Sequence, residues 1–171
     1  MKKNIPKIQN ILNQKESTMK IHKYCLCFLF MCVCSFVCAQ TAAEMDRLLE
    51  KEKISSGEAA RFVLEVAGLL PPGVSGQAAE NAAYDIAKSK GWITKGVNEK
   101  LSLQETAFLI MSAFQLQGGV LYTLAPGPRY AYREMVYRRL IQGRADPDMS
   151  VSGQRLLHII DRTMSHSGGV Q

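Results

Sequence analysis

The sequence predicts an all-α fold, in which three pseudo-repeated helix-turn-helix units follow an N-terminal leader. Serines that can cap helices recur at similar intervals, at Ser55, Ser102 and Ser152. A helix-like segment that opens with Ala-Tyr begins at Ala83 and again at Ala131. Apolar residues recur with helical spacing after each of these starts. Self-similarity of this kind is typical of units that bury their apolar faces by packing on one another.

Residues 1–39 are expected to form an N-terminal extension and a signal peptide. Met19 is the expected start of translation, because the residues before it are polar and add nothing to a signal. After it, two lysines precede the apolar run 24–37, and small residues end at Ala39. This pattern is typical of a cleaved secretory signal. A retained signal anchor is the less favoured alternative, since an anchor needs roughly 18–20 apolar residues.

All five cysteines also fall in the leader, and they are Cys25, Cys27, Cys32, Cys34 and Cys38. Cys38 is a candidate for lipid modification, because bacterial lipoproteins keep a lipidated cysteine at the end of the leader. Val37 before it is not small, so cleavage after Ala39 is favoured over lipidation. Disulfides, thiolate zinc sites and cysteine nucleophiles are then excluded from the mature domain.

The charge of the chain also resides mainly in the leader. Of 21 basic and 15 acidic residues, six lysines and one glutamate lie in residues 1–39, which leaves 15 basic and 14 acidic residues. A balance this even does not predict a nucleic-acid partner, which needs a concentrated positive face. Residues 40–164 can bury one core and are expected to form a single domain. Residues 165–171 are expected to be a disordered tail.

The first unit covers about residues 42–68. A short helix occupies its start, and Ser55 with Glu58 then forms a capping box. In a capping box the serine side chain accepts from the third helical amide, and the glutamate reaches back to the amide of the cap. The helix that follows is expected to stop near Gly68, since glycine readily adopts the left-handed conformation that ends helices.

The second unit covers about residues 78–118. Its first helix is expected to end at Gly91, a suitable left-handed C-cap. Ser102 and Glu105 repeat the capping box, and the second helix is expected to continue to Gly118 and Gly119. Residues 120–128 indicate an irregular connection that permits a short strand.

The third unit covers about residues 129–164. Its first helix is expected to end at Gly143. Ser152 is then predicted to cap the last helix with only half of the device, because Arg155 stands where the glutamate of a capping box would be.

These units resemble the repeats of the S-layer homology family, with the first repeat truncated. The family repeat places an apolar-Ile-x-Gly turn and an aspartate before an apolar-Thr-Arg-Ala-Glu helix start. Residues 140–153 fit the turn and the cap, and residues 101–105 and 54–60 fit the helix start. The resemblance implies three repeats packed as a three-lobed helical bundle, in which the motif arginine grips cell-wall polysaccharide. At the position of that arginine this sequence has Ser56, Leu103 and Gly153.

The resemblance implies a non-catalytic cell-envelope module, for binding or scaffolding, that contacts a cell wall polymer or an envelope protein. The alternative is a periplasmic helical subunit that mediates only protein–protein assembly and has no glycan ligand. Either protein is expected to be exported to the periplasm or cell envelope. The membrane is expected to be contacted only through the signal peptide or a lipid anchor at Cys38. No cofactor is expected.

One local basic stretch is the best candidate for a binding surface, together with the turns before each capped helix. Its members are Arg129, Arg133, Arg138, Arg139, Arg144 and Tyr132. Such a patch can hold a wall polymer, a phospholipid head or an acidic partner. The alternative is a solvated helix face, whose arginines lie over tyrosines or pair with Glu134.

The residues do not favour a catalytic site or a calcium-binding loop. His158 and Asp161 are spaced as a base and its orienting group on one helix, but no nucleophile is identifiable, so no enzyme is expected. The run that begins at Asp146 has some likeness to a calcium loop. Such a loop needs glycine at position six and glutamate at position twelve, and Val151 and Leu157 stand there. No metal site is expected.

Overall fold

The computed structural model describes residues 43–144 and 146–168. The chain divides into two compact units, Met1–Asp46 and Arg47–Gln171. Within the described residues every regular element is a helix, and the only β-type pairing is two isolated bridges, so the all-α prediction is confirmed. The leader expected over residues 1–39, with Cys38, lies outside the described residues, as do residues 169–171.

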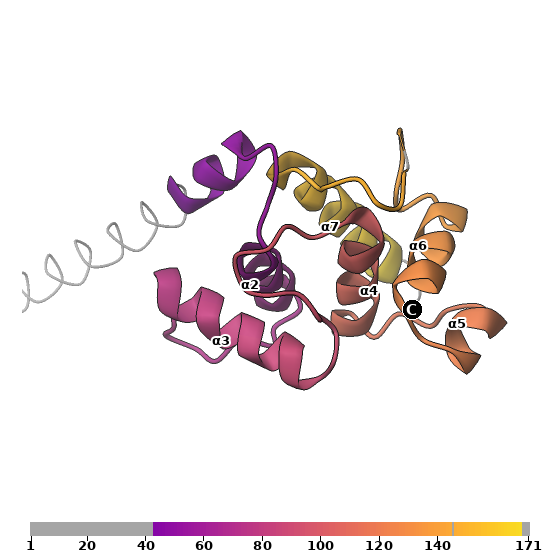
Figure 1. Ribbon diagram of the computed structural model, residues 1–171, viewed down its shortest axis with the longest axis horizontal. Coiled ribbons are helices and arrows are strands. Elements are labelled where there is room, and N and C mark those ends of the chain that lie inside the picture. Colours follow the sequence, from indigo (N-terminus) through magenta and orange to yellow (C-terminus); the bar gives the residue numbers. More distant parts are fainter. Residues whose placement is uncertain (1–42, 145, 169–171) are drawn as a thin grey trace, which may run out of the picture. The chain divides into compact units, whose positions relative to one another are not determined.

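Helix packing crosses the boundaries between the expected sequence units. Residues 43–50 are helical. The later helices are α2 (Ser56–Val66), α3 (Gly76–Ser89), α4 (Leu103–Ala113), α5 (Val120–Leu124), α6 (Pro128–Tyr137) and α7 (Gly153–Gly168). Helix α2 packs on α3, α4 packs on α6, and α2 also touches α4 (Figure 1). Each Ala-Tyr helix therefore packs on the capped helix that precedes it in the chain.

The predicted helix starts are confirmed. In α2, the Glu58 amide donates to Ser55 Oγ at 3.2 Å and the Ser55 amide donates to Glu58 Oε2 at 3.0 Å. Ser102 and Glu105 form the same reciprocal pair at α4. At α7 only the first half is present, because the amide of Arg155 donates to Ser152 Oγ at 3.3 Å. The capping serines are thus helix-start devices in all three places.

Backbone hydrogen bonds join the first turns of the three capped helices, an arrangement we call the cap ring. The first helical amide of α2 donates to a carbonyl in the loop before α4, and that of α4 donates to a carbonyl in the loop before α7. The first helical amide of α7 donates to a carbonyl in the segment before α2, which closes the ring. The bonds run from Ser56 N to Glu99 O at 2.8 Å, from Leu103 N to Met149 O at 2.9 Å, and from Gly153 N to Lys51 O at 2.9 Å. Helix-start donors that lack an intrahelical acceptor are satisfied in this way.

The residue before each capping serine enters the core. Ile54 and Val151 are fully buried and Leu101 is 1% exposed. The Ile54 amide donates to Val151 O at 3.0 Å, so these backbones are direct neighbours. Each helix start is therefore fixed by a cap on one side and by a buried apolar side chain on the other.

Two helices end earlier than the sequence indicates. Helix α4 stops at Ala113 instead of the double glycine, and Gln115 takes the left-handed conformation with φ 51°. Helix α6 stops at Tyr137 instead of Gly143, and Arg139 is left-handed with φ 58°. The prediction failed because both turns use residues other than glycine, which carry no helix-end signal.

Two other segments are more helical than expected. Residues 120–124 form α5, not a strand, and its carbonyls accept the usual helical bonds, as from the Ala125 amide to Leu121 O at 3.1 Å. Helix α7 runs to Gly168, so residues 165–168 of the expected disordered tail are helical. Burial of Thr163, whose Oγ1 donates to Ile159 O at 2.8 Å, shows that α7 is still packed close to its end.

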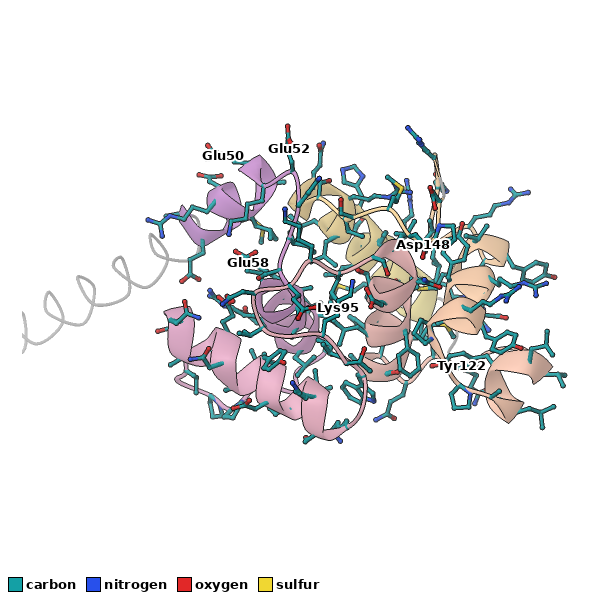
Figure 2. All side chains as sticks on the ribbon, viewed as in Figure 1. Glu50, Glu52, Glu58, Lys95, Tyr122 and Asp148 are labelled. Atoms are coloured by element: carbon teal, nitrogen blue, oxygen red, sulfur yellow. The ribbon has the colours of Figure 1, made fainter. Side chains whose placement is uncertain are left out.

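Lysines support both capping-box glutamates. Lys51 pairs with Glu58, and Lys95 Nζ lies 2.8 Å from Glu105 Oε2. Figure 2 labels Glu58 at α2 and Lys95 between α2 and α4. Partial burial alone would raise the pKa of each carboxyl. The hydrogen bonds from lysine and from the capping serine outweigh it, so both pKa values lie below the usual 4.5.

Acid is expected to remove this support. A carboxyl with a depressed folded pKa stabilises the fold above its unfolded pKa, and the effect is lost as the pH falls through the folded value. We expect the free energy of unfolding, from urea titrations at pH 7 and pH 3, to fall less with acid in a Glu58→Gln/Glu105→Gln variant than in the wild type. An unchanged pH dependence would contradict this assignment.

Glu80 supplies the control with the opposite sign. Burial and the charge of Glu58 raise its pKa, so its ionised form opposes folding at neutral pH. Glu80→Gln is therefore expected to increase the free energy of unfolding at pH 7 and to lose this advantage in acid.

Candidate functional site

The basic stretch expected as a binding surface does not form one face. Arg129 and Arg133 are exposed and lie one turn apart on α6. Arg138 instead pairs with Glu134, its Nε 2.7 Å from Oε1, and also donates to the Gln117 carbonyl. This arginine therefore holds the segment before α5 against α6.

The remaining members of the stretch lie elsewhere. Arg139 and Arg144 follow the end of α6, and both are exposed. Tyr132 is half-buried and close enough to Arg155 to influence the pKa of that guanidinium. The α6 face therefore keeps two of the five arginines, and Tyr132 belongs with the start of α7.

A cleft at the start of α7 gathers two arginines and a histidine, and we call it the α7 cleft. It has a volume of about 460 Å³. Its lining residues are Gln142, Gly143, Ser152, Gln154, Arg155, His158, Ile159 and Arg162. Three of them, Arg155, His158 and Arg162, follow one another at helical spacing on α7, and no carboxylate is among the lining residues.

Arg155 is the residue that distinguishes the third helix start from the other two. Where α2 and α4 carry a glutamate that receives a lysine, α7 carries a guanidinium that reaches back to its own loop. It donates to the Gln142 carbonyl at 3.4 Å, to Met149 Sδ at 3.1 Å, and to the Arg144 carbonyl. Burial lowers the pKa of Arg155, with Tyr132 acting in the opposite direction, but an arginine stays charged in any such setting.

A second hollow lies between α5 and α6, and we call it the tyrosine cleft. It has a volume of about 270 Å³. Its lining residues are Gly119, Val120, Leu121, Tyr122, Tyr130, Arg133, Glu134 and Tyr137. Glu134 is compensated here, because it accepts from the Gly119 amide at 3.1 Å as well as pairing with Arg138.

The residues considered for catalysis or metal binding are only partly brought together. His158 lines the α7 cleft, whereas Asp161 does not. Asp146 accepts from the Asp148 amide at 3.0 Å, as in an Asx turn, and Asp148 receives a bond from Gln104 at 2.7 Å. Across residues 43–144 and 146–168, no group of three His, Cys, Asp or Glu side chains is placed to hold a metal ion.

Comparison with known proteins gives no relative: no family model, no curated protein and no solved structure matches the chain. Among the described helices, none combines the length and the apolar character needed to cross a bilayer. The residues of the two clefts and the sequence pattern are therefore the features that indicate a function.

Proposed function

We propose that the protein is a non-catalytic binding module of the cell envelope, which holds an anionic wall polymer in the α7 cleft. The observation that carries the proposal is the lining of this cleft, with Arg155, Arg162 and His158 and no carboxylate. Guanidinium groups bind carboxylates and phosphates through paired, charge-assisted hydrogen bonds. The volume of about 460 Å³ is in the range of ligand sites.

An S-layer homology-like arrangement of three lobes is part of the same proposal. Its support is the cyclic order of the cap ring, which links the loops before the three caps. The α7 cleft also lies beside the third of these caps, at Ser152. At this cap Gly153 stands where the family motif has its arginine, but Arg155 provides a guanidinium two residues later. The leader pattern of residues 1–39 supports export to the periplasm or cell envelope.

Sedimentation with purified cell-wall sacculi tests this function. The wild-type chain is expected to sediment with them at physiological salt, and less so as salt is raised. Arg162→Gln is expected to weaken binding by about tenfold, the effect of one or two lost charge-assisted hydrogen bonds. Arg155 is unsuitable for this test, because its guanidinium also holds loop carbonyls.

Lys90→Gln is the matched control, since it removes one exposed positive charge from the end of α3. It is expected to leave sedimentation unchanged. Equal loss in both variants would show a diffuse charge effect and count against a site in the α7 cleft. No sedimentation of the wild type would overturn the proposal and favour a periplasmic subunit that mediates only protein–protein assembly.

A further inference from the structure

Helix α5 exposes aliphatic side chains to an unusual degree. It has no buried residue. Val120 is 75% exposed, Leu124 78% and Leu121 54%. Residues 120 and 124 lie one helical turn apart, so their side chains share a face of α5. Contiguous exposed apolar residues of this kind mark an interaction surface more often than single ones do.

The position of α5 is fixed by contacts that leave this face outward. The ring of Tyr122 meets that of Phe108 edge to face, with centroids 6.4 Å apart, and a side chain at Gly118 would overlap Tyr122. Figure 2 labels Tyr122 beside α5. The Gly119 amide donates to Glu134 on α6. Figure 1 shows α5 beside α6 and away from α2 and α3. The apolar face is thus presented on an ordered support.

The surroundings of α5 are cationic and aromatic. No aspartate or glutamate occurs between Glu105 and Glu134, and Glu134 is paired with Arg138. Arg129 and Arg133 are exposed on the adjoining helix. Exposed Tyr137 and half-buried Tyr130 line the tyrosine cleft next to α5. Exposed aliphatic side chains beside tyrosines and arginines match the layers of a lipid surface.

We propose that α5 and the adjoining face of α6 dock on the surface of a bilayer that contains anionic phospholipids. Val120, Leu121 and Leu124 enter the boundary between headgroups and acyl chains. Tyr130 and Tyr137 lie at headgroup level, and Arg129 and Arg133 contact the negative lipids. This contact is distinct from the α7 cleft and does not rest on the function proposed for it.

A bilayer explains the combination better than a glycan does. A wall polymer offers no apolar phase for Val120 and Leu124, whereas acyl chains do. The charge of the surface, with two exposed arginines and no uncompensated acid, is complementary to anionic headgroups. Because the inserted surface is small and the cations are few, the contact is expected to be reversible and weakened by salt.

Hydrogen exchange of the full chain with vesicles tests the proposal at α5 itself. The backbone amides of residues 120–125 are expected to exchange at least about threefold more slowly with vesicles of phosphatidylglycerol and phosphatidylcholine than without vesicles. Pure phosphatidylcholine vesicles are expected to give much less protection, since they lack the charge that the arginines need. The readout is local, so a leader that inserts by itself does not produce it.

Variants of the full chain provide the comparison. Val120→Asp/Leu124→Asp is expected to abolish the protection, and Arg129→Gln/Arg133→Gln to weaken vesicle partitioning by about 25-fold, at roughly fivefold per arginine. Met164→Asp is the control, because Met164 is another exposed apolar residue, 51% exposed, on α7. All the substituted side chains are exposed, and unchanged thermal unfolding is expected to show that each variant folds.

Each of the following outcomes would overturn the proposal. The first is the absence of protection at α5 with anionic vesicles. The second is protection that survives in the Val120→Asp/Leu124→Asp variant or is equally strong with neutral vesicles. The third is protection that arises without vesicles when the protein concentration is raised, which would identify a second copy of the chain as the occupant. The fourth is protection by sacculi alone, which would identify a wall polymer.

Discussion

Gly153→Ala is expected to lower the free energy of unfolding by about 3 kcal/mol or more, at the upper end of the cost of overpacking a filled site. Gly153 is the first residue of α7, and its amide donates to Lys51 O at 2.9 Å. A methyl group there would overlap the carbonyl of Leu48, whose side chain is itself buried. The backbones would have to separate, and the third bond of the cap ring would weaken.

Urea unfolding followed by circular dichroism measures this loss, and Gly127→Ala is its control. Gly127 precedes α6 with an extended φ of −175°, and the nearest atom to an added methyl is 4.0 Å away. The control is expected to cost less than about 1 kcal/mol, as a changed cap residue does. Similar losses in the two variants would refute the close approach of Gly153 to Leu48.

Leu101→Ala is expected to lower the free energy of unfolding by about 2–5 kcal/mol, the range for a leucine removed from a packed core. Leu101 is 1% exposed and directly precedes the Ser102 cap. The substitution leaves a cavity beneath the helix start and removes the apolar side chain that fixes it. Thermal and urea unfolding of the variant measure the effect.

Leu124→Ala is the matched control, because the same atoms are removed from a side chain that is 78% exposed. Its effect on stability is expected to be within about 0.5 kcal/mol. A large loss at Leu124 would mean that α5 is covered within the fold. It would also remove the basis for the proposed docking on lipid.

The parts of the fold that the sequence predicts well are those with local causes. Ser55 with Glu58, and Ser102 with Glu105, form their capping boxes because the partners are three residues apart on one turn. The left-handed Gly91 was predicted for a similar reason, and its φ is 71°. These devices need no information from the rest of the chain.

The errors in helix length come from interactions at a greater distance. Gln115 and Arg139 adopt left-handed conformations, although neither residue type indicates a helix end. Helices α4 and α6 end just before them. In α5, the Val, Tyr and Thr residues favour a strand by propensity, but Tyr122 packs on Phe108 and holds a single helical turn. Tertiary contacts override weak local preference in such places.

The candidate site was found only in part for a related reason. The sequence groups Arg138 with the candidate binding surface and leaves pairing with Glu134 as the alternative, and the structure shows that pair. Arg162 was missed. A signal for it exists, since Arg155, His158 and Arg162 share one face of a helix at spacings of three and four residues. The turn at Gln142 that completes the α7 cleft is not visible from this pattern.

The bond from Gly153 to Lys51 has a consequence for folding. An open array of repeats can gain or lose a terminal unit while the others stay folded, because each repeat touches only its neighbours. Here the first turn of the last helix is completed by the segment before the first capped helix. Neither end can detach without breaking a contact of the other. Residues 51–160 are therefore expected to unfold in a single cooperative step.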